Sequence, residues 1–346
     1  MRYDVVIATL NRPESLKSCL SLLEKQTEIP RRVIIVDASD DHQAVHDEVM
    51  RARDQSIEWM FIESDVRSSP RQRNLGLAYV DSDIVLLPDD DSMLYPNAAA
   101  EMLAAYRLDV RHEVGGVSGV AADRPPTGRQ NTQIARSRQL KERVQPLRNR
   151  LEDIFVTKPF NSYPRELWSS RELPDWVDGQ RFVPVETIGG YLLSLRAEVV
   201  KRHPFDEVMG YGIGYALHED MELSLRLQRS GYLLVAARQA PIFHDVHPSK
   251  RAGGFNYGFC WIANYLYACR RDLPEESPAW REHLPRFLVY KLALYRARAQ
   301  VRRDEYSREV WQGAQAAWQE RHELMSADGP ELPQIYRDLC DRHIRH

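Results

Sequence analysis

The sequence predicts an α/β protein with a mostly parallel sheet and flanking helices, and three observations support this prediction. Short apolar runs rich in β-branched residues alternate with helix-like stretches through the first 120 residues. The apolar runs are hydrophobic throughout, as expected when helices cover both faces of a sheet. In the first helix-like stretch, Leu16, Leu20 and Leu23 recur at helical spacing.

Each of the first four predicted strands is followed by one predicted helix. The apolar runs expected to form strands cover residues 3–9, 32–37, 57–62, 83–88 and 114–120. The stretches expected to form helices cover residues 13–26, 42–54, 69–80 and 96–108. Pro13 and Pro96 stand near helix starts, where a missing N–H loses no hydrogen bond. This rhythm is typical of βαβ units.

Residues 121–180 depart from the rhythm, because they are rich in arginine, polar and interrupted by prolines. They indicate either a solvated surface excursion or flexible loop, or a mobile lid or acceptor-binding element. Regular patterning returns over 181–200, followed by a predicted helix at 218–231 and a predicted strand at 232–237. We therefore expect an α/β domain over residues 1–250, with 121–180 as a variable insertion. A C-terminal helical region is expected over residues 251–346.

Composition excludes several classes of protein. A net charge of −3 gives no bias toward nucleic acid. The four cysteines form no CxxC pair, which argues against a zinc site or a disulfide framework and fits a reducing compartment. No apolar run reaches the roughly 18 to 20 residues needed to span a bilayer, and the N-terminus lacks the pattern of a signal peptide. We expect a cytoplasmic protein.

Polar and acidic side chains follow the predicted strands, which is where open α/β sheets bind ligands. The most unusual group is Asp89-Asp90-Asp91, which follows the strand at 83–88. Adjacent like charges repel one another, so a cation beside them would explain the group better than a plain acidic turn. Two carboxylates separated by one residue can both turn toward a cation, and oxygen ligands suit Mg²⁺ or Mn²⁺.

Taken together, these motifs resemble glycosyltransferase family 2. The stretches that carry the resemblance, in the family's order over residues 1–250, are VVIATLNRPES, RVIIVDASDD, RQRNLGLAYVDSDIVLLPDDD, IGGYLLSLRAEVV, HEDMELSLRLQRSGY and FHDVH. The resemblance implies the Rossmann-like GT-A fold of nucleotide-diphospho-sugar transferases, a sugar-nucleotide donor and inversion at the anomeric carbon. The family's usual Asp-Asp-Gly-Ser reads Asp37-Ala38-Ser39-Asp40 here, which leaves the geometry of that turn open.

The resemblance also implies roles on the donor side. Asp89 and Asp91 would hold Mn²⁺ or Mg²⁺ on the leaving diphosphate, with Asp91 as the direct ligand. His244 is the matching metal-binding histidine, and His247 is the alternative. Donor- and nucleotide-binding roles fall on Thr9, Asn11, Arg12, Asp37, Arg71, Asn74, Asp89, Asp90, Gly189 and Gly190.

On the acceptor side, the resemblance makes Asp220 the catalytic base. Its neighbour Glu219 would orient the acceptor or fix the start of the helix. Without the resemblance, an acidic pair in a first helical turn is only favourable macrodipole chemistry. Gly189 and Gly190 would lie near the donor sugar, and the alternative for them is a plain bulge.

The sequence therefore predicts an inverting, metal-dependent glycosyltransferase that moves a sugar from a nucleoside diphosphate to a hydroxyl group. A UDP-sugar is the favoured donor, and a dTDP-sugar or a GDP-sugar is the next candidate. The acceptor is open among a saccharide, a lipid-linked saccharide, a protein and a small metabolite, in polysaccharide, glycolipid or glycoconjugate biosynthesis.

Two alternatives stay open: a catalytically inactive nucleotide- or carbohydrate-binding scaffold, and a sugar nucleotidyltransferase. The nucleotidyltransferase should carry a glycine-rich phosphate loop after the first strand, but ATLNRPES contains no glycine. The same absence argues against a Rossmann dehydrogenase.

The segment at 284–303 mixes Leu, Phe and Tyr with Arg and Lys. It would pack one face on the core, make peripheral contact with the inner face of a membrane, or form a homodimer interface.

Overall fold

The computed structural model describes residues 1–52, 56–127, 156–160, 171–214, 216–245 and 253–344. The chain divides into two compact units. The first combines Met1–Pro126 with Leu173–Arg251, and the second combines Thr127–Glu172 with Ala252–His346. Each unit is described by itself.

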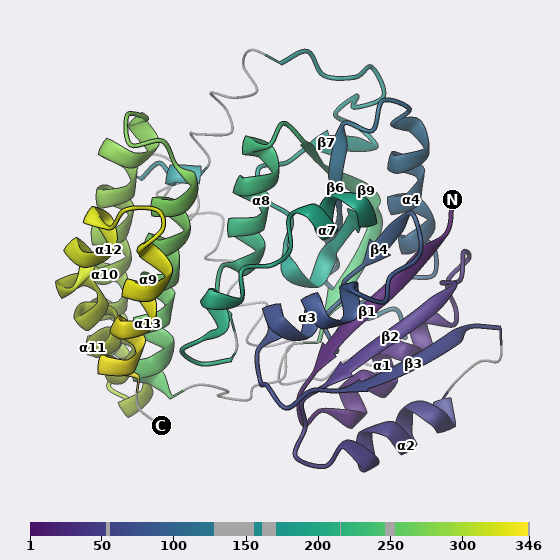
Figure 1. Cartoon of the computed structure of the whole chain (residues 1–346), viewed down its shortest axis with the longest axis horizontal. Helices are drawn as coiled ribbons and strands as arrows, with labels where there is room; N and C mark the ends of the chain where they lie inside the picture. Colours follow the sequence, from purple (N-terminus) through teal and green to yellow (C-terminus); the bar gives the residue numbers. More distant parts are fainter. Residues whose placement is uncertain (53–55, 128–155, 161–170, 215, 246–252, 345–346) are drawn as a thin grey trace. The chain divides into compact units, whose positions relative to one another are not determined.

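One mixed sheet organises the first unit (Figure 1). Among the described residues its strands follow the order β3-β2-β1-β4-β8-β6-β9-β5, and β7 pairs with β9. The strands are β1 (Tyr3–Thr9), β2 (Arg32–Asp37), β3 (Glu58–Glu63), β4 (Ile84–Leu86), β5 (Ser92–Leu94), β6 (Val114–Ala121), β7 (Phe182–Pro184), β8 (Leu193–Arg196) and β9 (Leu233–His244).

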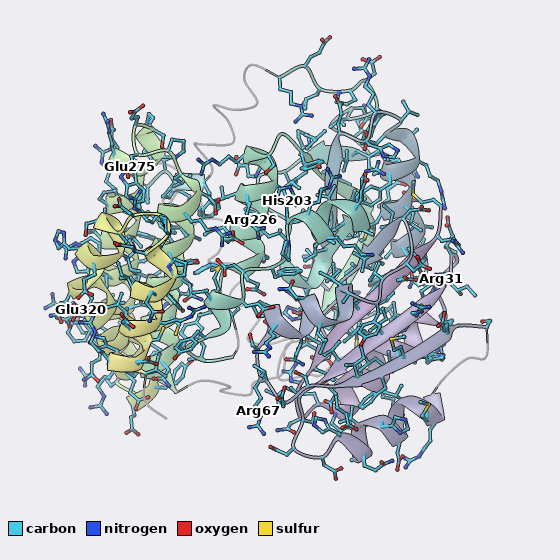
Figure 2. All side chains as sticks on the ribbon, in the orientation of Figure 1. Arg31, Arg67, His203, Arg226, Glu275 and Glu320 are labelled. Carbon is cyan, nitrogen blue, oxygen red and sulfur yellow. The ribbon has the colours of Figure 1, made fainter. Side chains whose placement is uncertain are left out.

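The first four strands in the order β3-β2-β1-β4 are parallel, as predicted. Beyond β4 the sheet is mixed: β8 runs antiparallel to both neighbours, and β9 is parallel to β6 but antiparallel to β5 and β7. In register, Thr9 pairs with Asp37 and Asp37 with Glu63, so these carboxyl ends share one edge. Arg31, which precedes β2, lies at the opposite end of the strands from Arg67, which follows β3 (Figure 2).

Helices pack on both faces of the parallel strands, because Val5, Val6 and Ile7 of β1 are all fully buried. Side chains from α3, α7 and α8 share one core cluster with Val6, Ile34 and other strand residues. The helices of this unit are α1 (Pro13–Leu23), α2 (His42–Ala52), α3 (Ser69–Leu77), α4 (Ala98–Leu108), α7 (Ala197–Arg202) and α8 (Glu219–Arg229), with 3₁₀ turns η1 (Gly190–Leu192) and η2 (Glu207–Gly210).

Helix α3 is tied directly to the ends of the parallel strands. The Gln72 amide donates to the backbone carbonyls of Thr9 and Val36, at 2.9 and 2.8 Å. Gly76 of the same helix lies so close to β1 that a Cβ there would come within 2.5 Å of a Val6 methyl carbon. This packing fixes which side of α3 faces the carboxyl edge of the sheet.

The second unit is helical in its described part, as expected for the C-terminal region. Its elements are α9 (Gly254–Asp272), the π-helical segment η3 (Ala279–His283), α10 (Leu284–Arg302), α11 (Glu305–Gln319), α12 (Arg321–Ser326) and α13 (Leu332–His343). Helices α9 and α11 approach closely through Gly258 and Gly313, where an added Cβ would lie 2.0 and 1.9 Å from backbone oxygens of the other helix. Among the described residues, no helix is both long and apolar enough to cross a membrane.

Candidate active site

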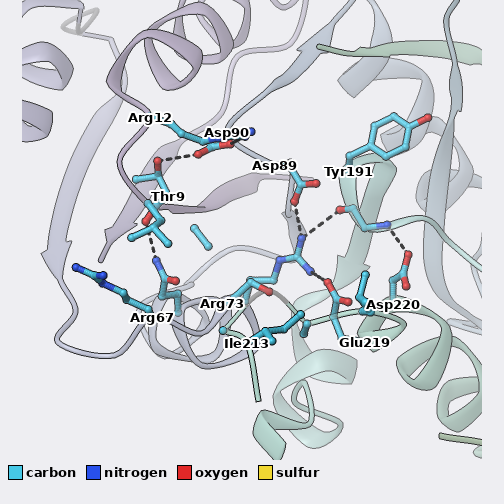
Figure 3. A pocket seen from close by; sticks show the side chains of 18 of the residues that line it. Thr9, Arg12, Arg67, Arg73, Asp89, Asp90, Tyr191, Ile213, Glu219 and Asp220 are labelled. Atoms are coloured by element: carbon cyan, nitrogen blue, oxygen red, sulfur yellow. Dashed lines mark hydrogen bonds and ion pairs between the residues drawn. The ribbon is translucent and has the colours of Figure 1, made fainter. Parts of the chain in front are cut away.

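A pocket of about 670 Å³ lies in the first unit, at the edge where the parallel strands end. Its lining comes from the loop after β1, the start of α3, the turn between β4 and β5, the start of η1 and the start of α8 (Figure 3). Asp89, Asp90, Glu219 and Asp220 all line it. The structure therefore brings together the two acidic groups that the sequence separates by about 130 residues.

The three aspartates form the turn that connects β4 to β5. Thr9 donates from Oγ1 to Asp90 at 2.8 Å. One nitrogen of the Arg12 guanidinium, Nη1, contacts both Asp90 and Asp91, at 2.8 and 2.7 Å. Burial raises the pKa of Asp90 to about 7, although Arg12 acts to lower it. The loop after β1 thus partly neutralises the acidic turn.

Asp89, Asp91 and His244 form a group that could hold a metal ion. Each offers one ligand atom, and these atoms lie within 4.8 Å of one another. Antiparallel pairing of β5 with β9 places Ser92 opposite His244, which brings the histidine to the acidic turn. Two carboxylates and an imidazole are a donor set that suits Mn²⁺ or Mg²⁺.

His244 is held from two sides. Its Nε2 lies 3.0 Å from Asp91 Oδ1, and its ring stacks on Tyr191 with centroids 4.2 Å apart. Burial alone would lower the pKa of His244, but the hydrogen bond and charge of Asp91 raise it overall. Asp91 therefore favours the protonated, positively charged form of His244.

The second acidic group is the pair that begins α8. Asp220 accepts hydrogen bonds from the backbone N–H of Gly190 and of Met221, both at 2.8 Å. Burial raises the pKa of Asp220 above its ordinary value, and burial raises the pKa of Glu219 to about 8. Carboxylates with raised pKa values are better proton acceptors than exposed ones.

Arg73 connects the two acidic groups (Figure 3). Its guanidinium donates to Asp89 at 2.8 Å and to Glu219 at 3.1 Å, and it lies over the ring of Phe205. Only 3% of the side chain is exposed. The sequence prediction assigned the donor-binding role to Arg71, but Arg71 is exposed and lies outside the pocket lining. Residues two apart on a helix point to different sides, so only one could face the pocket.

The predicted nucleotide-binding residues divide into two sets. Thr9, Asn11, Arg12 and Gly190 line the pocket. Asn11 adopts a positive φ of 54° and exchanges hydrogen bonds with Asp40, at 2.8 and 2.9 Å.

The second set lies outside the pocket lining. Asp37 is fully buried, and its two oxygens accept from Ser39 Oγ at 2.5 Å and face His42 Nδ1 at 2.6 Å. Asn74 instead binds the backbone of Phe205: its Nδ2 donates to the carbonyl oxygen and its Oδ1 accepts from the N–H, both at 2.9 Å. Gly189 has an ordinary φ of −73°, so no positive φ explains that glycine.

Several predictions fall outside the described residues. They are most of the variable insertion (128–155 and 161–170), for which a lid is one of the alternatives, and the alternative metal ligand His247.

The fold and the acidic pocket define the class of a GT-A glycosyltransferase. Residues 4–167 match the model for glycosyl transferase family 2, so this part of the chain is a family 2 domain and its class of activity is glycosyl transfer. This confirms the resemblance read from the sequence. No curated protein sequence matches the chain.

Solved structures with this fold extend the comparison. The chain is similar to S. aureus TarS 1–349 in complex with UDP-GlcNAc, with a TM-score of 0.55 and 13% identity over 99% of this chain and 91% of that one. It is also similar to the mannosyltransferase PcManGT from Pyrobaculum calidifontis in complex with GDP-Man and Mn²⁺. That TM-score is 0.53, with 14% identity over 99% of this chain and 86% of the other. At these identities the likeness establishes the fold, which is the predicted one.

Proposed function

We propose that the protein is an inverting, metal-dependent glycosyltransferase that moves a sugar from a nucleoside diphosphate to a hydroxyl acceptor. One observation carries the proposal. A group able to hold a divalent cation (Asp89, Asp91, His244) lies in the same pocket region as Asp220, a carboxylate with a raised pKa. Arg73 donates to Asp89 of the first group and to Glu219, the chain neighbour of Asp220. Glycosyl transfer needs both functions within reach of one sugar.

On the donor side, Asp91, Asp89 and His244 would hold Mn²⁺ or Mg²⁺. Such a cation, when bound, stabilises the negative charge that develops on a departing diphosphate. Arg12 already contacts Asp91, so its positive charge would also lie close to the departing diphosphate. The complex of PcManGT with GDP-Man and Mn²⁺ supports this assignment by analogy of fold.

On the acceptor side, Asp220 would take the proton of the acceptor hydroxyl. The freed oxygen forms a bond to the anomeric carbon while the bond from that carbon to the diphosphate oxygen breaks. The diphosphate leaves with the bonding electron pair, and a single displacement of this kind inverts the configuration. Glu219, held by Arg73, would keep Asp220 and the start of α8 in place.

We propose UDP as the nucleotide to test first, with dTDP and GDP as the next candidates. The fold relatives include one complex with UDP-GlcNAc and one with GDP-Man, so both nucleotides belong in the test. Thr9 and Asn11, at the end of β1, would contact the nucleotide. We also propose that the GT-A domain covers residues 1–250, interrupted by the variable insertion at 121–180, that a helical region follows over 251–346, and that the enzyme works in the cytoplasm.

The alternatives gain less support. A nucleotidyltransferase would need a glycine-rich loop after β1, where this chain has Asn11 and Arg12. An inactive scaffold would have no need for both acidic groups.

A thermal-shift panel tests the proposal with UDP, dTDP, GDP and CDP, each with and without Mn²⁺. A ligand that binds only the folded state raises its stability by RT ln(1 + [L]/Kd). We expect one nucleotide to give a Mn²⁺-dependent shift that is lost in Asp91→Ala. The matched control is Asp47→Ala, which removes an exposed carboxylate on α2. A shift without any Mn²⁺-dependent hydrolysis or transfer of the corresponding sugar nucleotide would favour the scaffold.

A further inference from the structure

Both oxygens of Asp91 already face nitrogen atoms of other side chains. Its Oδ2 lies 2.7 Å from Arg12 Nη1, and its Oδ1 lies 3.0 Å from His244 Nε2. Asp89 is arranged in a similar way, because Arg73 donates to its Oδ1 at 2.8 Å and its Oδ2 lies 3.9 Å from His244 Nε2. Each of the two carboxylates that could hold a cation with His244 therefore has an arginine on its other oxygen.

Arg12 is held firmly beside the acidic turn. Its side chain is only 11% exposed, and the same Nη1 atom also contacts Asp90 at 2.8 Å (Figure 3). Its carbonyl oxygen accepts from the N–H of Leu16 at 3.0 Å, at the start of α1. Asn11, which precedes it, is tied to the loop after β2 by three hydrogen bonds. The backbone is thus fixed on both sides, and the guanidinium is placed on Asp91.

An arginine on a ligand carboxylate affects a cation and an anion in opposite ways. Arg12 offsets the negative charge of Asp91, and its own charge would repel a divalent cation held by the same carboxylate. A diphosphate brings negative charge that can compensate both the cation and the guanidinium. Arg12 therefore disfavours the cation alone and favours the cation together with the anion.

We propose that Arg12 makes cation binding at Asp89, Asp91 and His244 conditional on the diphosphate of the donor. This inference rests on the proposed function, because it takes Mn²⁺ or Mg²⁺ and a nucleoside diphosphate as the ligands. The coupling is reciprocal, so the factor by which the nucleotide tightens Mn²⁺ binding is also the factor by which Mn²⁺ tightens nucleotide binding. An arginine that only orients Asp91 as a ligand would act with the opposite sign, because it would strengthen the binding of Mn²⁺ alone.

Binding of Mn²⁺ to the full chain tests the proposal without turnover, measured by electron paramagnetic resonance as the loss of the free-ion signal. Without nucleotide, R12Q should bind Mn²⁺ at least about tenfold more tightly than the wild type, because a charge that repels the ion is removed. R12K keeps that charge and should stay within about threefold of the wild type. The control R67Q removes an arginine that lines the same pocket but pairs with Asp40, so it should leave the affinity for Mn²⁺ alone unchanged.

The second measurement repeats the Mn²⁺ titration with UDP, dTDP, GDP and CDP in turn. At least one of them should tighten Mn²⁺ binding to the wild type by about tenfold or more, and the same nucleotide should tighten binding to R12Q by less than about threefold.

Four results would overturn the proposal. Weaker binding of Mn²⁺ alone to R12Q than to the wild type would make Arg12 a residue that orients Asp91. Equal affinities of R12K and R12Q would mean that the planar guanidinium matters and its charge does not. Wild-type protein that binds Mn²⁺ equally well with and without every nucleotide would show that no coupling exists, and the proposed function would stand. No Mn²⁺ binding to the wild type under any of these conditions would instead overturn the proposed metal dependence, and this inference with it.

Discussion

The two acidic groups of the pocket carry the same kind of charge in different settings. In the β4–β5 turn, Asp91 contacts Arg12 at 2.7 Å and His244 at 3.0 Å, so cationic side chains surround it. At the start of α8, Asp220 is held by two backbone N–H groups, each at 2.8 Å. Amide dipoles neutralise a carboxylate less than full charges do, and burial raises the pKa of Asp220.

We expect this difference to separate two chemical tasks, cation binding and proton transfer, within one pocket. A carboxylate surrounded by cationic side chains can exchange one cation for another. A dehydrated carboxylate with a raised pKa gains free energy when it accepts a proton. Arg73 contacts one member of each acidic group, Asp89 and Glu219, and so fixes the distance between the two groups. Three substitutions test whether one acidic group binds the cation and the other accepts the proton, from the largest expected effect to the smallest.

Asp220→Asn should strongly reduce turnover and preserve donor binding. An amide cannot accept the acceptor proton, so we expect kcat to fall by about 10²- to 10⁴-fold. The Mn²⁺-dependent nucleotide shift should remain, because the turn with Asp91 is untouched. Turnover assays and thermal shifts on the same preparation check both halves. Loss of the nucleotide shift in Asp220→Asn would mean that the two groups act as one site.

Arg73→Lys should uncouple the two groups. A lysine keeps the charge but cannot bridge Asp89 and Glu219 with a planar fork, so we expect kcat/KM to fall by about 10- to 100-fold. The Mn²⁺ concentration for half-maximal activation should rise as well. The control is Arg196→Lys, because Arg196 is equally buried, pairs with Asp109 at 2.7 Å and lies outside the pocket lining. It should lower stability without moving the Mn²⁺ requirement. Equal Mn²⁺ curves for both variants would make Arg73 a purely structural residue.

Much of the fold can be predicted from the sequence where apolar runs are long and cleanly bounded. β1 and β2 span the predicted residues, because polar or proline residues interrupt the chain on each side. The three-residue strands β5 and β7 were missed because such short runs carry no periodicity. β9 continues to His244, seven residues beyond its predicted end. Arg238, Gln239 and Pro241 break the apolar pattern, but pairing with β6 resumes at Pro241 after a register shift.

The candidate site was predictable to the level of motifs. The cluster of Asp89, Asp91 and His244 matches the predicted metal group in position, although its role stays a prediction. The sequence could not show which of Arg71 and Arg73 faces the pocket, because this depends on the rotation of α3 about its axis. That rotation is set by tertiary contacts of Gln72 and Gly76 with strands far away in the sequence.

Asp37 illustrates the same limit. A polar residue at a strand end is a fair candidate for ligand binding, but local partners can satisfy it first. Here Ser39 and His42 engage both oxygens of Asp37 within the loop that follows β2. The departure from the family's usual Asp-Asp-Gly-Ser, which begins at Ala38 in place of the second aspartate, was the signal that this turn differs.

Glu219→Gln should change how stability depends on pH. Burial raises the pKa of Glu219 from 4.5 to about 8 in the folded state, so folding favours its protonated form. The stabilisation from that proton is complete below pH 4.5 and is lost as pH rises through 8. A glutamine stays neutral, so the free energy of unfolding of the variant relative to wild type should rise by up to about 4 kcal/mol between pH 5 and pH 9. Urea unfolding at both pH values measures this difference, with Glu58→Gln as the exposed control on β3. A difference that stays constant with pH would mean that Arg73 keeps Glu219 ionised throughout, and both acidic groups would then be charge-paired.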